Sequence, residues 1–309
     1  ESSAASDVYK RQSVGTRIGV IGLPGKWSTE KLADAVEAKT GFRLVIDMQH
    51  VVLDVSTQTL NYQGFDLCRL DALIVKKISN TYSPHSVNRL ELLRIAEKKG
   101  VRVFSGADNI LRLINRMSCT ISLIDASVPM PETCITEDID IALETIKHYK
   151  TAVLKPLFST KARGMCIIDA SKDQGHIKKQ IKDFKKDNPM MYIQKMMNLP
   201  GQDLGLIFLG GNYLGSYARV GKKGSWNTTI HSGGHYTGCE PGADIIDIAH
   251  KAQAIFNMDF TTVDIAETEQ GPVVFEVSAF GGFRGALEGC GIDAADLYVD
   301  YVLNKLPID

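Results

Sequence analysis

Two acidic residues near the C-terminal end, Asp264 and Glu276, stand inside runs that otherwise read as buried strands. A buried carboxylate without a partner is costly, so something must compensate its charge. Residues 269–271 read as a short hairpin loop between the two runs, and Gly271 can adopt a positive φ there. This turn places position 264 opposite position 276, to within one residue. Directly opposed Cβ atoms lie about 4.5–5.5 Å apart.

Two carboxylates at that distance repel each other unless a proton or a cation lies between them. Oxygen ligands without Cys or His favour Mg²⁺, which usually shares its shell with water and substrate phosphates. Because side chains alternate along a strand, we expect Val274, Glu276 and Ser278 on one face and residues 273, 275 and 277 on the other. We therefore interpret the hairpin as a site for a hard cation. The alternative is a hairpin whose acids face solvent.

A second feature that could do chemistry is Lys155, which ends an apolar strand and precedes a loop of small and basic residues. The loop residues that offer hydroxyls, backbone amides or positive charge are Ser159, Thr160, Lys161, Arg163 and Gly164. Such groups suit the oxygens of a triphosphate. The alternative is a basic surface loop, which fits poorly with a lysine at the end of a buried strand.

Two arginines are placed to meet an anion. Arg219 lies in the strand predicted over 215–220, and Arg284 lies between glycines just after the acidic strand. A guanidinium in either place can bind a carboxylate or a phosphate in a bidentate manner. For Arg284, a salt bridge at the rim of the fold is an equal alternative.

Two glycine-containing patterns are weaker. The spacing over residues 19–26 is neither a dinucleotide fingerprint nor a Walker A motif, so it favours a tight strand–helix turn over nucleotide binding. His231 and His235, with Cys239 nearby, could suggest zinc, but the intervening Gly-Gly pair argues against the helix that such a site uses. A glycine-rich loop over a substrate is the favoured interpretation of that segment.

Composition excludes some classes of partner. The 309 residues are 44% hydrophobic and carry 35 basic and 36 acidic side chains, which gives no electrostatic reason to expect nucleic acid or a membrane. No apolar run approaches the roughly 20 residues of a transmembrane helix, and no signal-peptide pattern opens the chain, so a cytoplasmic protein is expected. The six cysteines are scattered without a CxxC pair, which favours reduced thiols. Residues 1–14 are expected to be a disordered or non-native tail.

Strands and helices alternate in the predicted order of elements. Predicted strands cover 17–22, 42–47, 72–75, 101–104, 152–155, 165–169, 191–194, 204–209 and 212–220, followed by the hairpin 261–278. Predicted helices cover 29–39, 88–99, 110–123, 138–149, 176–186, 244–257 and 294–304. This alternation indicates an α/β protein whose first domain has a mainly parallel sheet. The expected divisions are 15–108, 109–190 and 191–309.

The order of these features resembles the ATP-grasp superfamily, specifically its RimK-like branch of carboxylate–amine ligases, over about residues 15–306. Within that branch the chain is most similar to the ATP-grasp protein of the bacterial GAK system, through the stretch FEVSAFGGFRG. The resemblance implies an ATP-grasp fold of the α/β (α+β) class, with an N-terminal Rossmann-like pre-ATP-grasp domain.

The resemblance also implies a role for particular residues. Arg116 and Lys155 would contact the phosphates of ATP, and the 159–164 loop would close over them. The residues of a hinge strand against adenine would be Gln194, Lys195, Met196 and Met197. Asp203 would lie near the ribose.

The remaining implied roles concern metal and substrate. Asp264 and Glu276 would hold Mg²⁺, with Mn²⁺ as an alternative ion and Ser278 as a third ligand. Arg219 would face the reacting carboxylate, and Asn227 to Thr229 would line the same site.

The chain departs from the family pattern at four positions. Ser278 stands where relatives usually have Asn, which puts a second metal position in doubt. Lys195 stands where an acid is common in the hinge, which puts the adenine contacts in doubt. Asn227 replaces an expected Arg, and Arg284 stands where relatives are often acidic. The last two departures predict an altered substrate pocket.

The activity that the resemblance implies is an ATP- and Mg²⁺-dependent ligation of a small-molecule carboxylate to an amine through an acyl phosphate. Arg219 and Arg284 suggest an acidic substrate, and the family pattern allows a homo-oligomer. Two alternatives remain. One is an ATP-grasp kinase, and the other is a non-catalytic nucleotide-binding subunit of a multiprotein system, for which Ser278 and Lys195 are the motivating features.

Overall fold

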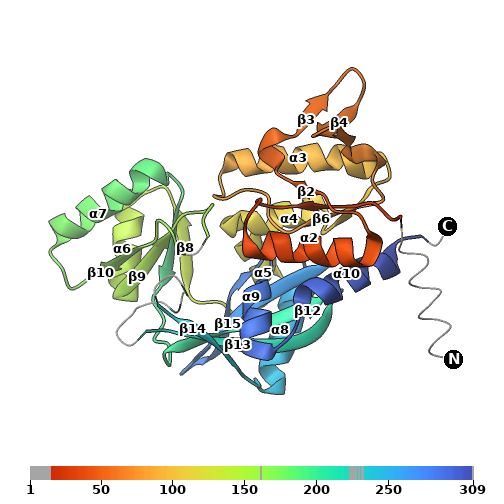
Figure 1. Ribbon diagram of the computed structural model, residues 1–309. Helices are drawn as coiled ribbons and strands as arrows, with labels where there is room; N and C mark the ends of the chain where they lie inside the picture. The colour runs from red at the N-terminus through yellow and green to blue at the C-terminus, as the bar shows by residue number, and fades with distance from the viewer. Residues whose placement is uncertain (1–14, 161, 223–227, 229, 231–232, 308–309) are drawn as a thin grey trace.

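The computed structural model describes residues 15–160, 162–222, 228, 230 and 233–307. The expected tail over 1–14 therefore lies outside the described residues. The chain forms an N-terminal body, a central body and a C-terminal body, which run from red through green to blue in Figure 1. Within the described segments, no helix is long and apolar enough to cross a membrane.

A parallel sheet in the order β2-β1-β6-β7 organises the N-terminal body. Its strands are β1 (Ile18–Ile21), β2 (Val45–Ile46), β6 (Ala72–Val75) and β7 (Arg102–Phe104). Helix α2 (Trp27–Thr40) packs on one face through Leu32 and Val36, and helix α3 (Pro84–Lys98) packs on the other. The mainly parallel sheet expected from the strand–helix alternation is confirmed.

Two glycines in and just after β1 serve close packing. A Cβ atom on Gly22 would lie 2.4 Å from Thr29 Cγ2, and one on Gly19 would lie 2.7 Å from Ile46 Cδ1. Only glycine permits so close an approach of β1 to its neighbours, which is to helix α2 at Gly22 and to strand β2 at Gly19. This geometry agrees with the tight strand–helix turn that the spacing favours.

A small antiparallel sheet, which the sequence did not predict, projects from the N-terminal body at the top of Figure 1. Its strands are β3 (Val52–Asp54), β4 (Thr59–Tyr62) and β5 (Phe65–Asp66), flanked by the short 3₁₀ helices η1 (Met48–His50) and η2 (Leu67–Arg69). These strands are two to four residues long, which is too short for an alternating pattern to predict them, although burial does alternate along β4.

The single helix predicted over 110–123 is wrong, because the chain breaks at Asn115. Helix α4 (Ala107–Ile114) ends there and helix α5 (Arg116–Asp125) begins. Asn115 is extended, with φ −93° and ψ 111°, and its side chain accepts hydrogen bonds from the first-turn amides of α5. An asparagine cap of this kind starts a new helix. Arg116 is consequently the first residue of α5 rather than a mid-helix residue.

The central body is a four-stranded antiparallel sheet in the order β10-β9-β11-β8, covered by two helices. Its strands are β8 (Thr133–Thr136), β9 (Thr151–Lys155), β10 (Cys166–Asp169) and β11 (Met191–Lys195). Helices α6 (Ile139–Tyr149) and α7 (Gln174–Asp187) bury Ile146 and Ile181 against it. Because β11 pairs with β8 and β9, the strand pairing favours a boundary after Lys195 over the expected boundary at 190.

The C-terminal body is a five-stranded antiparallel sheet in the order β14-β13-β12-β15-β16. Its strands are β12 (Gln202–Leu209), β13 (Asn212–Val220), β14 (His235–Gly238), β15 (Phe260–Thr268) and β16 (Gly271–Val277). Its helices are α8 (Ala243–Ala254), α9 (Phe283–Cys290) and α10 (Ala294–Lys305). Helix α10 returns to the N-terminal body and packs against α2, so the first and last bodies share one core.

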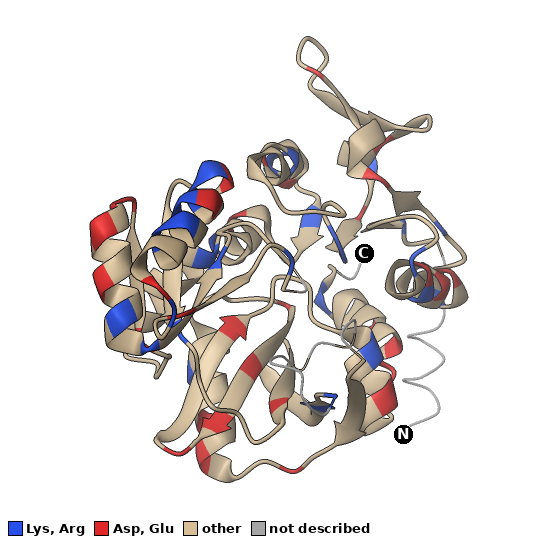
Figure 2. Ribbon diagram, turned by 90° about the vertical axis from the view of Figure 1, so that its left-hand side faces the viewer, with Lys and Arg blue, Asp and Glu red and all other residues tan. Residues whose placement is uncertain are grey.

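Charge is distributed without a dominant sign. Basic and acidic residues are interspersed over the helices in Figure 2. All six cysteines lie in described segments as free thiols, of which Cys119 is buried and the other five are half-buried.

Candidate active site

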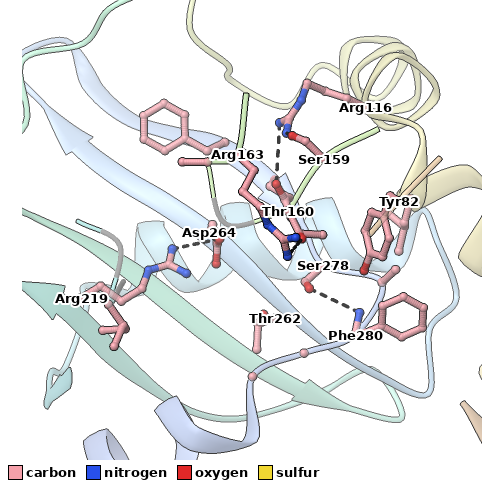
Figure 3. Close-up of a pocket in the computed structure, with 18 of the residues that line it drawn as sticks. Tyr82, Arg116, Ser159, Thr160, Arg163, Arg219, Thr262, Asp264, Ser278 and Phe280 are labelled. Atoms are coloured by element: carbon pink, nitrogen blue, oxygen red, sulfur yellow. Dashed lines mark hydrogen bonds and ion pairs between the residues drawn. The ribbon is translucent and has the colours of Figure 1, made fainter. Parts of the chain in front are cut away.

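A cavity of about 800 Å³ lies where the three bodies meet. It is lined by loops of the N-terminal body, by the β9–β10 loop and β11 of the central sheet, and by the strands of the C-terminal sheet. Figure 3 shows part of this lining, with basic side chains approaching from several elements.

Most residues singled out from the sequence line this one cavity. They are Arg116, Lys155, Ser159, Thr160, Arg163, Gln194, Lys195, Met196, Met197, Asp203, Arg219, Asp264, Glu276, Ser278 and Arg284. Gly164 is not in the lining, and its positive φ of 71° turns the chain back against Pro156. Lys161, Asn227 and Thr229 lie outside the described residues, so their predicted contacts stay predictions.

The acidic hairpin has the predicted register, since Asp264 of β15 directly opposes Glu276 of β16. The Asp264 side chain is 18% exposed, and its Oδ2 lies 2.9 Å from a guanidinium nitrogen of Arg219. Its Oδ1 is buried without a hydrogen-bond partner among the described residues. The Glu276 side chain is 47% exposed and lies 3.7 Å from Arg116. One carboxylate oxygen of the pair is therefore buried and unsatisfied.

The strict alternation expected along β16 is wrong, because the strand pairing shifts between Asp264 and Ile265. Ile265 pairs with Val274, which leaves Phe275 as an extra residue in β16. Such a bulge re-aims the side chains that follow it. Val274 and Val277 are both buried in the core, while Phe275 and Glu276 both line the cavity.

Burial raises the pKa of Asp264 to about 7, and the nearby charges of Asp203 and Glu276 add to this effect while Arg219 opposes it. A carboxyl group with a raised pKa and an unsatisfied oxygen is stabilised when a cation approaches it. The carboxylate oxygens of Asp264 and Glu276 are consequently suited to a hard divalent ion.

The protein supplies few ligands for such an ion. Among the described residues, no group of three or more His, Cys, Asp or Glu side chains is arranged to hold a metal. The Ser278 hydroxyl lies in the cavity and accepts a hydrogen bond from the Phe280 amide at 3.3 Å. Two carboxylates and a hydroxyl leave most of an octahedral shell to water and phosphate oxygens. His231, one of the residues of the zinc alternative, lies outside the described residues.

Lys155 reaches the cavity from the end of β9. Its Nζ donates to Gln194 Oε1 at 2.5 Å and lies 5.3 Å from the centroid of the Phe275 ring. Burial lowers the pKa of Lys155 to about 7, the nearby Arg116 lowers it further, and Glu276 opposes both. An anion in the cavity would restore the charged form of this lysine.

The start of α5 joins the loop between β9 and β10 to the hairpin that carries Asp264 and Glu276. The Arg116 amide donates to the carbonyl of Leu157 at 2.9 Å, and its guanidinium donates to the carbonyl of Pro156 and to Ser159 Oγ. The same guanidinium pairs with Glu276, and Figure 3 shows it directed at the loop. Arg116 is 10% exposed, so its position is fixed by this set of contacts.

Arg219 lies between two carboxylates. It forms a two-pronged interaction with Asp203, and it also pairs with Asp264. Thr228 donates a further hydrogen bond to Asp203. Asp203 therefore holds Arg219 in place and also accepts from Thr228. The predicted ribose contact would have to displace one of these two partners.

One row of directly paired residues crosses the C-terminal sheet on the cavity side. It runs Gly238, Tyr217, Gly205, Asp264 and Glu276 over the five strands. A Cβ atom on Gly205 would lie 2.5 Å from Tyr217 Cζ, so the ring lies across the glycine toward Asp264. The absence of a side chain at Gly205 is thus a packing requirement of the site.

The end of β11 and the two residues that follow Lys195 line the cavity next to these groups. Lys195 Nζ pairs with Glu132 at 2.5 Å, which directs its charge to the neighbouring β8 side. Gln194 is buried and also donates to Thr133. Met196 and Met197 follow as apolar lining.

Sequence reasoning missed the contribution of the N-terminal body. Lys76, Lys77 and Tyr82 follow β6 and line the cavity, as does Trp27 at the start of α2. The sequence carried a signal for Lys76, because this lysine directly follows a buried strand of four residues. Lys155, which the sequence analysis did select, lies in the same way at the end of a strand.

Solved structures identify the fold of the chain. The ATP-grasp ligase PsnB complexed with its minimal precursor superimposes with a TM-score of 0.72 at 18% identity, covering 94% of this chain and 99% of that chain. Its complex with minimal precursor, Mg and ADP gives 0.71 at 17% identity, covering 94% and 97%. The fold is that of the ATP-grasp ligases.

Sequence relatives and a family model identify the class of protein to which the chain belongs. The chain is 25% identical over 322 residues to a tetrahydromethanopterin:alpha-L-glutamate ligase of Methanosarcina acetivorans, covering 94% of this chain and 99% of the relative. Residues 114–302 match the RimK-like ATP-grasp domain, so the chain belongs to the RimK-like ATP-grasp family. It is an ATP-dependent ligase that forms a C–N bond between a carboxylate and an amine.

Proposed function

We propose that the ligation proceeds through an acyl phosphate made from the substrate carboxylate. A carboxylate oxygen forms a bond to the γ-phosphorus of ATP, the bond from that phosphorus to the β–γ bridging oxygen breaks, and ADP leaves. The amine nitrogen then forms a bond to the carbonyl carbon, the bond to the phosphate oxygen breaks, and the amine loses a proton. The products are an amide, ADP and phosphate.

The phosphate-binding groups would come from three elements. Arg116 begins α5, Lys155 ends β9, and the loop between β9 and β10 carries Ser159, Thr160 and Arg163. Charged donors of this kind position a triphosphate and stabilise the charge that develops on transfer. The contact of Arg163 with the carbonyl of Asn80 at 3.4 Å joins this loop to the N-terminal body.

Asp264 and Glu276 would hold Mg²⁺, with Ser278 as a weaker oxygen donor. When bound, the ion would neutralise charge on the phosphate oxygens. The unsatisfied Oδ1 of Asp264 supports this assignment, since a cation supplies the partner that the fold does not. Mn²⁺ remains an alternative, because the same oxygen donors suit both ions.

The other roles follow from position. The segment from Gln194 to Met197 would lie against adenine. Arg219, held by Asp203, would meet the oxygen of the reacting carboxylate and stabilise its negative charge as the amine attacks. The altered hinge residue Lys195 is paired with Glu132, which supports a hinge that contacts adenine through backbone groups.

A single observation carries this proposal. Asp264, whose Oδ1 is buried and unsatisfied among the described residues, lines a cavity that also receives Lys155 and Arg116 from other elements. A magnesium–triphosphate complex satisfies the acid and the cations together.

Product analysis with an isotope label tests the proposal. Purified protein would be supplied with Mg-ATP and pairs of carboxylates and amines, beginning with L-glutamate because the relative above is named a glutamate ligase. ADP release and mass spectrometry identify the pair that reacts. A carboxylate labelled with ¹⁸O is expected to transfer one ¹⁸O to the released phosphate. Unlabelled phosphate together with an amide product would overturn the acyl phosphate.

Three variants complete this test. E276Q and D264N are expected to lose turnover, because each removes one of the two charged metal ligands. E144Q is the matched control, since Glu144 is exposed on α6 and its ion-pair partner among the described residues is Lys147. The cytoplasmic location and the homo-oligomer expected from the sequence stay predictions.

A further inference from the structure

Tyr217 is a buried side chain of the cavity to which the proposed chemistry gives no role. It lies on β13, is 2% exposed and lines the cavity. Its ring covers Gly205 of β12, because a Cβ atom on this glycine would lie 2.5 Å from Tyr217 Cζ and 2.7 Å from the Tyr217 hydroxyl oxygen. Gly205 in turn pairs with Asp264 of β15. The ring therefore extends across β12 toward the acidic hairpin.

Helix α9 covers the other side of the same ring with glycines. A Cβ atom on Gly285 would lie 2.4 Å from Tyr217 Cζ, and one on Gly289 would lie 2.4 Å from Tyr217 Cβ. A Cβ atom on Gly282, the residue before the helix, would lie 3.2 Å from the hydroxyl oxygen. The ring is thus enclosed between the sheet and α9, with its hydroxyl at the start of the helix. Close packing of this kind fixes the direction of the hydroxyl before a substrate binds.

The Tyr217 hydroxyl has no hydrogen-bond partner within the segments that the structure describes. In those segments, the side-chain polar atom that is both fully buried and unpartnered is Asp264 Oδ1. The Tyr217 oxygen is therefore not fully enclosed, and it borders the cavity that its residue lines. Because a buried tyrosine usually has a partner for its hydroxyl, this free donor indicates a contact with a bound substrate.

Arg219 projects from the same face of β13, two residues further along the strand. Its guanidinium lies 2.9 Å from Asp264, and Figure 3 shows it directed at this acid. Burial raises the pKa of Tyr217, while the nearby charge of Arg219 lowers it and that of Asp264 raises it. The hydroxyl of Tyr217 and the guanidinium of Arg219 are therefore two neighbouring donors on one wall of the cavity.

We propose that Tyr217 is a catalytic residue of the second step, in which the amine attacks the acyl phosphate. The lone pair of the amine nitrogen forms the bond to the carbonyl carbon, and the π pair of the carbonyl group moves to its oxygen, which becomes negative. Tyr217 donates a hydrogen bond to this oxygen beside Arg219 and keeps its proton. The carbonyl bond then forms again as the bond to the phosphate oxygen breaks.

A fixed phenol suits this role. Its pKa is about 10 in water, so the hydroxyl is protonated at neutral pH and can donate. A hydrogen bond to an ionised oxygen is stronger than one to a neutral carbonyl, so the contact gains strength as the negative charge develops. A donor that the fold already holds in place stabilises this charge without rearrangement. The inference rests on the proposed function, because it adds a donor to the acyl phosphate that this function requires.

A single-turnover experiment with rapid quenching tests the step at which Tyr217 acts. Protein in excess over ATP is mixed with Mg²⁺ and the pair of substrates that the product analysis identifies, with L-glutamate as the first partner tried. ADP in each quenched sample reports phosphoryl transfer, and the amide reports attack by the amine. In Y217F, amide formation is expected to slow by about a hundredfold while ADP formation keeps its rate.

Two measurements separate this effect from packing. Y217F keeps the ring that the glycines enclose, so its thermal unfolding and its affinity for Mg-AMP-PNP in calorimetry are expected to equal those of the wild type. Y213F is the matched control, since Tyr213 lies on the same strand outside the cavity and its hydroxyl donates to Ser216 Oγ at 2.9 Å. This control is expected to form ADP and amide at the rates of the wild type.

Three outcomes would overturn the inference. One is a Y217F protein that forms the amide as fast as the wild type. Another is an equal slowing of ADP and amide formation, which would place the hydroxyl in the first step. The third is weaker binding of Mg-AMP-PNP by Y217F, which would assign the hydroxyl to the nucleotide. None of them touches the proposed function, whose own failure would appear as the absence of ¹⁸O transfer by the wild type.

Discussion

Replacing Asp264 by Asn is expected to have opposite effects on stability and activity. In the folded chain without ligands, burial raises the pKa of this carboxyl from 3.8 to about 7. Each pKa unit corresponds to about 1.4 kcal/mol, so the ionised side chain destabilises the unliganded fold by up to about 4 kcal/mol near pH 7. An asparagine removes the charge but keeps an oxygen that can accept from Arg219.

The measurable result is a more stable but inactive protein. D264N is expected to unfold at a higher urea concentration than the wild type without ligands, by about 1–4 kcal/mol in the free energy of unfolding. It is also expected to lose most of the stabilisation that Mg-AMP-PNP gives the wild type, because one of the two charged metal ligands is gone. The turnover of D264N is expected to fall together with this loss of stabilisation by Mg-AMP-PNP.

A matched variant separates burial from metal binding. The Glu276 side chain is 47% exposed, so E276Q is expected to change the stability of the unliganded protein little while losing the stabilisation by Mg-AMP-PNP. A D264N protein that is no more stable than the wild type without ligands, and that is stabilised by Mg-AMP-PNP to the same extent, would refute the reasoning.

Three further predictions follow from the same cavity. K155M is expected to weaken Mg-AMP-PNP binding about ten- to a hundredfold in calorimetry, since a charged hydrogen bond contributes about 1.5–3 kcal/mol, and an unchanged affinity would contradict this. Because the pKa of Lys76 is about 7 in the fold against 10.5 in the unfolded chain, the unfolded state binds more protons between pH 7 and 10. The free energy of unfolding should consequently rise with pH in that window, with a contribution of at most about 1.4 kcal/mol per pH unit that K76M removes in urea titrations. G205A is expected to destabilise the protein by about 1–3 kcal/mol, since its Cβ would meet the Tyr217 ring, and thermal unfolding of G205A against a G205A/Y217A double variant checks whether the ring is the cause.

The residues that act through local chain geometry could be predicted from the sequence. The pairing of Asp264 with Glu276 followed from the length of one turn, and the strands and loop around Lys155 followed from an apolar run and its end. The break at Asn115 could not be predicted in this way, because the apolar pattern continues from α4 into α5. A tertiary contact of Arg116 with the carbonyl of Leu157 accompanies that break, and it depends on a segment about forty residues further on.

The contact of the N-terminal wall of the cavity with the C-terminal sheet was hidden for a similar reason, although Lys76 itself follows an apolar strand. Lys76 and Gly281 are distant in sequence and meet only because the N-terminal body closes against the C-terminal sheet. No pattern within either segment predicts that contact. The bulge at Phe275 was equally hidden, since its pairing depends on β15 and not on the composition of β16.

The bulge at Phe275 has a consequence for how the hairpin folds. Val274 and Val277 are both buried, so β16 presents two apolar side chains to the core that are three residues apart. A slip of β16 by one residue against β15 would turn one of these valines outward and would carry Glu276 toward the interior. The misaligned hairpin would thus bury a charge and expose an apolar side chain at once. The polypeptide itself therefore determines how β16 aligns with β15, before any nucleotide or ion reaches the two acids.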